Sequence, residues 1–194
     1  MPKKYFKIKV GGYTIIETMI AVSLFIVIVM ASMNALLNAN LLHQKSQSMR
    51  SIIDSLSFAM EDISRNLRTG YDYRCFNVPG AITMGVPRSC ASGWAIAFKP
   101  QGYDPLNDDN QWVYYIDNGK IYKSINNGDT FIQLNPDEVY IDQSYGFSVL
   151  GAEPFPGDSQ QPFVTIRLVG SITSKEAVTP FSLQTSVSQR VIDI

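Results

Sequence analysis

The chain has 194 residues, of which 45% are hydrophobic and 17% are charged, and its formal net charge is −1. This balance excludes an intrinsically disordered chain and fits one ordinary globular domain with an appendage. The hydrophobic residues are, however, distributed unevenly along the chain.

An uncharged apolar segment lies near the N-terminus. It contains no Asp, Glu, Lys or Arg from Thr18 to Gln44, and it is long enough to span a membrane. It follows four lysines: Lys3, Lys4, Lys7 and Lys9. The positive-inside tendency therefore predicts a single-pass protein of the cytoplasmic (inner) membrane, with its N-terminus in the cytoplasm and everything after about His43 outside it.

The apolar segment continues as one face of a longer helix. Beyond the span, hydrophobic residues recur at steps of three and four: Leu42, Met49, Ile52, Ile53, Leu56, Ala59, Met60, Ile63 and Leu67. No Pro or Gly interrupts Tyr13 to Thr69, and Gly70 supplies a C-terminal stop. We expect a helix of about 57 residues and about 85 Å, apolar over 13–42 and amphipathic over 43–70.

Beyond Gly70 the hydrophobic period changes to two. In "QWVYYIDNGKIYKS" the pair Asn118-Gly119 separates alternating apolar residues, which predicts a β-hairpin. Further strands are predicted at Trp94 to Lys99, Thr130 to Leu134, Glu138 to Asp142, and Gly146 to Leu150.

Two C-terminal segments alternate most clearly. "FVTIRLVGSIT" and "PFSLQTSV" each place apolar residues on one side: Val164, Ile166 and Leu168 in the first, Phe181, Leu183 and Val187 in the second. A sheet with one apolar face and a helix with one apolar stripe bury each other. The sequence therefore predicts an α+β fold, in which Met49 to Leu67 packs on an antiparallel β-sheet head formed by 71–194.

Both cysteines, Cys75 and Cys90, fall in the part expected outside the cytoplasm. Disulfides persist in such compartments, so we expect these cysteines to close a short loop. The alternative is a pair of buried thiols that do not meet.

Glu17 is the unusual residue of the apolar segment. A carboxylate in hydrocarbon costs about 2.5 to 3.5 kcal/mol, so an intramembrane acid is first interpreted as functional. A secretory signal peptide or an uncleaved signal anchor would explain the lysines and the apolar run. However, no small-x-small cleavage site follows the run, and a plain anchor explains neither Glu17 nor the paired glycines Gly11 and Gly12.

The stretch "KIKVGG" followed by "YTIIETMIAV" resembles the class III signal of type IV pilins and type II secretion pseudopilins. The resemblance lies in a short basic leader, a glycine before the cut, an aromatic first mature residue and Glu as the fifth. It implies that prepilin peptidase removes a leader of 1–12 by cutting between Gly12 and Tyr13, and that Tyr13 is then N-methylated. Because Gly12 has no side chain, its backbone can lie close to a peptidase.

The spacing between the cut and Glu17 is one helical turn, so cleavage would create a cation near the buried anion. In the resembled family, the glutamate is thought to meet the N-terminal amine of a neighbouring subunit as helices pack into a filament, which offsets the desolvation of both groups. Pairing of Glu17 with its own amine, or extension to the lipid headgroups, remains open.

A weaker likeness is found at the other end of the chain. "FSLQTSVSQRVIDI" is similar to the closing strand of the larger minor subunits, the J-type pseudopilin and the W-type minor pilin. The resemblance implies a non-enzymatic minor pilin or pseudopilin that helps to initiate or cap a pilus or pseudopilus. Its partners would be other pilins through the N-terminal helix, prepilin peptidase and an inner-membrane assembly platform.

Two alternatives remain: a binding module at a pilus tip, for adhesion or DNA uptake, and a plain signal-anchored exported domain. Loss of the four leader lysines would lower the formal charge from −1 to −5. Such an acidic body gives no strong nucleic-acid signal.

Few residues suggest other chemistry. His43 is the only histidine, so the chain lacks the set of residues that a hydrolytic triad or a typical zinc site needs. The loop "DPLNDDN" holds weak calcium candidates, Asp104, Asn107, Asp108 and Asp109, but its spacing is not that of an EF-hand and no metal or cofactor is predicted. The aromatic residues from Trp112 to Tyr115 are interpreted as sheet residues and not as a stacking platform.

Overall fold

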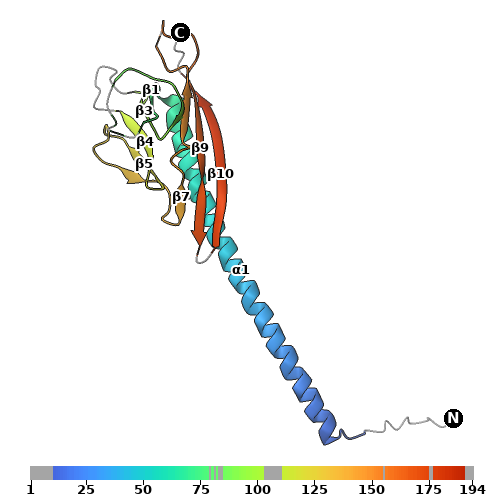
Figure 1. The fold of residues 1–194 in the computed structure, drawn as a ribbon. Coiled ribbons are helices and arrows are strands. Elements are labelled where there is room, and N and C mark those ends of the chain that lie inside the picture. Colours follow the sequence, from blue (N-terminus) through green and yellow to red (C-terminus); the bar gives the residue numbers. More distant parts are fainter. Residues whose placement is uncertain are drawn as a thin grey trace, which may run out of the picture. The chain divides into compact units, whose positions relative to one another are not determined.

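The computed structural model describes residues 11–78, 80, 82, 85–102, 111–154, 156–174 and 177–190. These residues form one helix followed by strands, as drawn in Figure 1: α1 (Ile15–Thr69), β1 (Tyr71–Phe76), β2 (Cys90–Gly93), β3 (Ala95–Lys99), β4 (Trp112–Asp117), β5 (Lys120–Ser124), β6 (Ile132–Gln133), β7 (Val139–Ile141), β8 (Phe147–Leu150), β9 (Phe163–Ser174) and β10 (Ala177–Ser188). The chain divides into two compact units, Met1–Ser46 and Gln47–Ile194. The second half of α1 thus belongs to the same unit as the strands.

The structure confirms the expected α+β, pilin-like fold with one long N-terminal helix. The helix begins at Ile15, two residues later than the sequence pattern suggested. It ends at Thr69, and the N–H of the next residue, Gly70, donates to the Asn66 carbonyl at 3.0 Å. A Cβ on Gly70 would lie 2.3 Å from the Phe98 ring, so the helix can pass this close to β3 only with a glycine at its end.

The strands form two antiparallel sheets where the sequence analysis expected one. Sheet A has the order β1-β3-β4-β5-β6, and sheet B has the order β10-β9-β8-β2, with β7 also paired to β9. Strand β2 belongs to sheet B because it pairs with β8, which lies far along the chain, and not with β1 or β3. Alternation alone does not reveal such long-range pairing.

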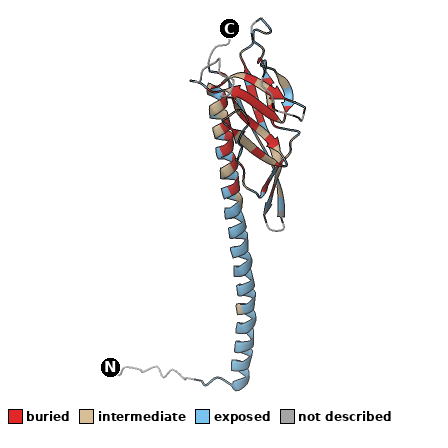
Figure 2. Cartoon of the chain, turned by 90° about the vertical axis from the view of Figure 1, so that its left-hand side faces the viewer, coloured by how far each residue is buried: buried red, intermediate tan, exposed pale blue. Residues whose placement is uncertain are grey.

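One hydrophobic core joins the helix to both sheets. The buried helix residues recur at steps of three and four along one stripe: Ile52, Leu56, Ala59, Met60, Ile63 and Leu67. They pack against side chains such as Phe98 of sheet A and Ile166 of sheet B, and Figure 2 shows the stripe in red. Leu42 and Ile53, which the pattern assigned to the same face, are exposed.

The predicted hairpin at Asn118-Gly119 and the two predicted C-terminal strands are confirmed. Asn118 and Gly119 have φ angles of 49° and 76°, as a type I′ turn between β4 and β5 requires. In sheet B, β9 and β10 pair along their full length. The predicted inward residues of β9 are buried and those of β10 are partly buried against the core: Val164, Ile166, Leu168, Phe181, Leu183 and Val187.

Candidate functional site

The first turn of α1 has the geometry of a capped helix. The backbone N–H of Glu17 donates to the Thr14 carbonyl at 3.1 Å and to Thr14 Oγ1 at 3.4 Å. Thr14 is therefore the N-cap, and Glu17 is the third residue of the helix. Thr followed three residues later by Glu is the capping-box pattern, which satisfies helix N–H groups that otherwise lack partners. This pattern was readable in the sequence but was missed there.

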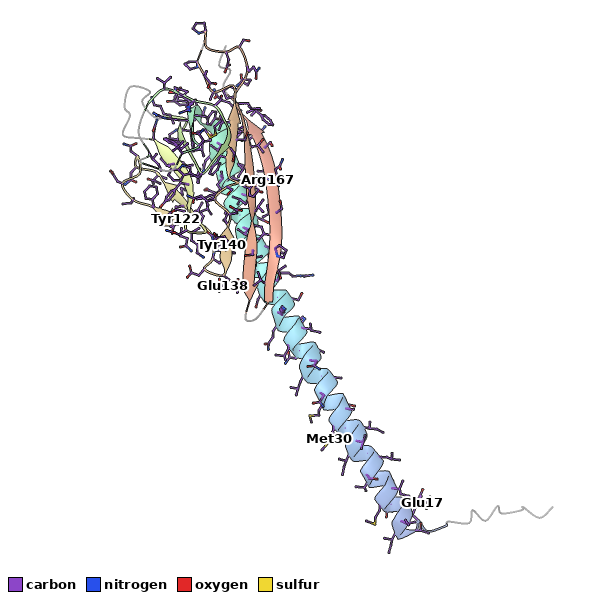
Figure 3. All side chains as sticks on the ribbon, viewed as in Figure 1. Glu17, Met30, Tyr122, Glu138, Tyr140 and Arg167 are labelled. Atoms are coloured by element: carbon purple, nitrogen blue, oxygen red, sulfur yellow. A yellow bond between two sulfur atoms is a disulfide. The ribbon has the colours of Figure 1, made fainter. Side chains whose placement is uncertain are left out.

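The carboxylate of Glu17 is exposed at the start of the helix, as Figure 3 shows. The positive end of the helix dipole lies at this turn and favours a negative side chain. Tyr13, one residue before the cap, is 82% exposed. The predicted cleavage and pairing residues therefore lie together in one exposed segment of the chain.

The predicted cleavage point has room around it. Gly11 and Gly12 lie outside the helix, and a Cβ built on either glycine would have no heavy atom within 4 Å. The leader lysines fall among residues 1–10, outside the described residues.

The first half of α1 exposes apolar side chains all round. Large hydrophobic residues with more than half of their surface exposed include Ile15, Met19, Phe25, Met30 and Leu36; Met30 is labelled in Figure 3. By length and composition the helix is apolar enough to cross a membrane, a property that membrane anchors and signal sequences share.

The hydroxyl groups of this apolar half have partners within the helix. The side chains of Thr18, Ser23 and Ser32 donate to the carbonyls of Ile15, Ile20 and Ile28 at 2.8, 2.9 and 2.8 Å. Hydroxyls bonded in this way need no water, so they suit a helix placed in lipid or among other helices.

The second half of α1 is tied to sheet A by a polar network. The Asp62 carboxylate accepts hydrogen bonds from Lys123 Nζ at 2.9 Å, Tyr114 Oη at 3.0 Å and Asn66 Nδ2 at 3.0 Å. Lys123 Nζ also lies 4.7 Å from the centre of the Trp112 ring. Burial raises the pKa of the Tyr114 hydroxyl, and the charge of Asp62 raises it further. The sequence analysis did not single out Asp62.

The disulfide between Cys75 and Cys90 is present. Cys75 lies in β1 of sheet A and Cys90 lies in β2 of sheet B, so the bond links the two sheets. Gly93 packs against it, since a Cβ there would lie 2.5 Å from Cys75 Sγ. Neither of these two strands was predicted.

The aromatic residues of β4 divide between the two faces of sheet A. Tyr114 is fully buried against the helix, whereas Tyr115 stacks on Tyr122 across the other face, with ring centres 4.9 Å apart. Phe131 meets Tyr115 edge-on at 4.6 Å. These rings are engaged with one another, as expected for sheet residues.

The calcium candidates Asp104, Asn107, Asp108 and Asp109 lie outside the described residues. Within the described ranges, no group of three or more His, Cys, Asp or Glu side chains could hold a metal ion. His43 lies exposed on α1.

The described residues thus contain an exposed apolar helix with a capped, acidic first turn, and a disulfide-linked two-sheet head built around the second half of that helix. Comparisons with protein-family models, with curated proteins and with solved structures find no match to this chain.

Proposed function

We propose that this chain is a minor pilin or pseudopilin, a non-enzymatic structural subunit of a type IV pilus or a type II secretion-like pseudopilus. Prepilin peptidase cuts it between Gly12 and Tyr13 and methylates the new amine. Its apolar helix then holds it in the cytoplasmic membrane, with the head outside the cytoplasm. From there it packs with the helices of other pilins on the inner-membrane assembly platform and helps to initiate or cap the filament.

The observation that carries this proposal is the segment Gly11 to Glu17. It combines an unhindered glycine pair, an exposed aromatic residue and an acidic first turn at the start of an apolar helix. A signal peptide that is removed after its apolar run has no use for this arrangement, because Glu17 would leave with it. The disulfide supports an extracytoplasmic head, since disulfides persist in oxidising compartments.

The helix also supports assembly by packing. Its apolar half presents side chains in all directions, with its hydroxyls bonded internally. Such a surface is stable either in lipid or in a bundle of similar helices. A subunit can therefore pass from membrane to filament without exposing the helix to water.

Mass spectrometry of the mature chain tests the proposal. The full chain is produced in membranes together with a prepilin peptidase, and its N-terminal peptide is sequenced. We expect Tyr13 as the first residue, carrying one added methyl group. An N-terminus at Met1, or a cut after the apolar run, would contradict the proposal.

Two glycine variants make a matched pair for this test. Because a Cβ at either glycine meets nothing within 4 Å, neither substitution disturbs the fold. Gly12→Val is expected to abolish processing by keeping the peptidase from the scissile bond, whereas Gly11→Val is expected to be cut at a rate much closer to that of the wild type.

A further inference from the structure

One cation lies on an otherwise uncharged surface of sheet B. Arg167 is the only charged residue in β9 and β10, and its side chain is exposed (labelled in Figure 3). Gln184 is its cross-strand partner in β10. In a body whose formal charge would be −5 without the leader, an isolated arginine among neutral polar side chains is a local site for an anion.

The guanidinium group is held in place. Its Cζ atom lies 4.6 Å from the centre of the Tyr145 ring, which is cation–π contact. The backbone N–H of Arg167 donates to the Gly146 carbonyl at 2.7 Å, which fixes the same turn beside β9. An arginine restrained by an aromatic ring loses little entropy when its planar donors meet a carboxylate.

Arg167 lines a surface pocket of about 360 Å³. This volume is near the lower end of the range for ligand pockets, about 300 to 1,000 Å³, and fits a small ligand. Its polar lining comes from β2, β8, β9, β10 and the turn before β8, and it includes Ser92, Ser144, Ser148, Thr165, Arg167 and Gln184. Among the described residues that line the pocket, none is acidic.

Two serine hydroxyls of the pocket, those of Ser92 and Ser148, already donate their protons to backbone carbonyls. Ser92 Oγ donates to the Ser144 carbonyl at 2.9 Å, and Ser148 Oγ donates to the Cys90 carbonyl at 3.4 Å. The lone pairs of both oxygens remain for donors on a ligand, and the Gln184 amide offers one further acceptor and two donors. The pocket therefore combines a cation with several hydrogen-bond acceptors.

We propose that this pocket binds a carboxylate-bearing sugar, such as a uronic acid. The carboxylate meets the Arg167 guanidinium, and the ring hydroxyls donate to Ser92, Ser148 and Gln184. A bare inorganic anion would satisfy the arginine but would bring its oxygens against the serine lone pairs. A neutral sugar would satisfy the acceptors and leave the arginine without a counter-ion. This binding activity is separate from filament assembly and does not depend on it.

Calorimetric titration of the full chain in detergent micelles tests the proposal with four probes: glucuronate, glucose, acetate and inorganic phosphate. We expect saturable binding of glucuronate in the millimolar range or tighter, and at least about tenfold weaker binding of the other three, because each lacks the carboxylate or the hydroxyls. Absence of saturable glucuronate binding would overturn the proposal. Equal binding of acetate or phosphate would also overturn it, since the site would then hold anions of any kind.

Two arginine variants assign the binding to the pocket. Arg167→Gln is expected to weaken glucuronate binding by about tenfold or more, because it removes a charge-assisted bidentate contact. Arg65→Gln removes an arginine whose side chain is 76% exposed on α1, and it is expected to leave the affinity unchanged. Arg167 is exposed, so its variant should show an unchanged unfolding temperature. Wild-type affinity in Arg167→Gln, or equal losses in the two variants, would refute the assignment.

Discussion

Glu17→Gln separates two roles of one residue, the helix start that the structure shows and the intersubunit pairing that the proposed function adds. Glu17 occupies the acidic position of the capping-box pattern, where its backbone N–H donates to Thr14 Oγ1, and under the proposed function it also pairs with the amine of Tyr13 in a neighbouring subunit. Glutamine serves in a capping box as well as glutamate does, but it cannot form an ion pair. The variant should therefore keep the helix start and lose only the intersubunit pair.

The free-energy costs expected for losing the helix cap and for losing the ion pair differ by several kcal/mol. Loss of an N-cap hydroxyl, as in Thr14→Ala, costs about 1 kcal/mol. Removal of one partner of a buried ion pair costs about 3 to 5 kcal/mol, because the other charge stays buried without compensation. At about 1.4 kcal/mol for each factor of ten, Glu17→Gln should lower incorporation into filaments by about a hundredfold or more.

The assay compares filaments sheared from cells with the membrane fraction of the same cells and measures the share of the chain in each. Glu61→Gln is the matched control, since the Glu61 side chain is 69% exposed on α1 and, among the described residues, bonds only to its helical neighbour Arg65. Thr14→Ala tests the cap alone. If Glu17→Gln reached filaments as efficiently as Glu61→Gln, while Thr14→Ala did not, Glu17 would be a capping residue and the intersubunit pair would be refuted.

Three further predictions concern the head. Asp62→Asn should lower the free energy of unfolding by about 1.5 to 3 kcal/mol, because charged hydrogen bonds from Lys123 and Tyr114 are lost. Glu61→Gln should change the free energy of unfolding by less than about 0.5 kcal/mol. Urea denaturation followed by tryptophan fluorescence compares the two variants, and equal effects would contradict a stabilising role of the Asp62 network. Hydrogen bonds from Ser89 lower the pKa of the Glu153 carboxyl group below its ordinary 4.5. The ionised Glu153 therefore stabilises the head fully above pH 4.5, and this stabilisation is lost as the pH falls through the lowered pKa. The stability difference between wild type and Glu153→Gln should accordingly shrink on acidification, and a difference independent of pH would count against this coupling. Gly170→Ala should destabilise the head by about 1 to 3 kcal/mol, since its Cβ would lie 1.9 Å from the Tyr140 carbonyl oxygen of β7 and would push that strand away from β9. A denaturation midpoint equal to that of the wild type would contradict this prediction, because it would show that β7 shifts without cost.

Local patterns in the sequence predict much of this fold. The turn at Asn118-Gly119, the two long strands of sheet B and the buried stripe of α1 all follow from spacing within one element. Each of these features is specified by residues that are neighbours in sequence, so periodicity is enough to find them.

The missed features depend on partners far along the chain or on irregular backbone. β1 contains Asp72 at a φ of 55° and a register shift, so it shows no regular alternation. β2 is short and pairs with β8, far along the chain, so spacing within one element does not reveal it. Asp62 sits at a polar position of the helix, and only the folded structure brings Lys123 within 2.9 Å of it.

The join between the end of the chain and the end of the helix bears on how the head responds to force. The backbone N–H of Arg190, just beyond β10, donates to the Arg68 carbonyl in the last turn of α1 at 3.0 Å. The last strand and the helix terminus are therefore fastened at one point, while the helix stripe is wedged into a core shared by both sheets. A force along the axis of the second half of the helix loads all contacts between the helix stripe and the two sheets at the same time. Because these contacts must break together and not one after another, the head resists tension along the helix.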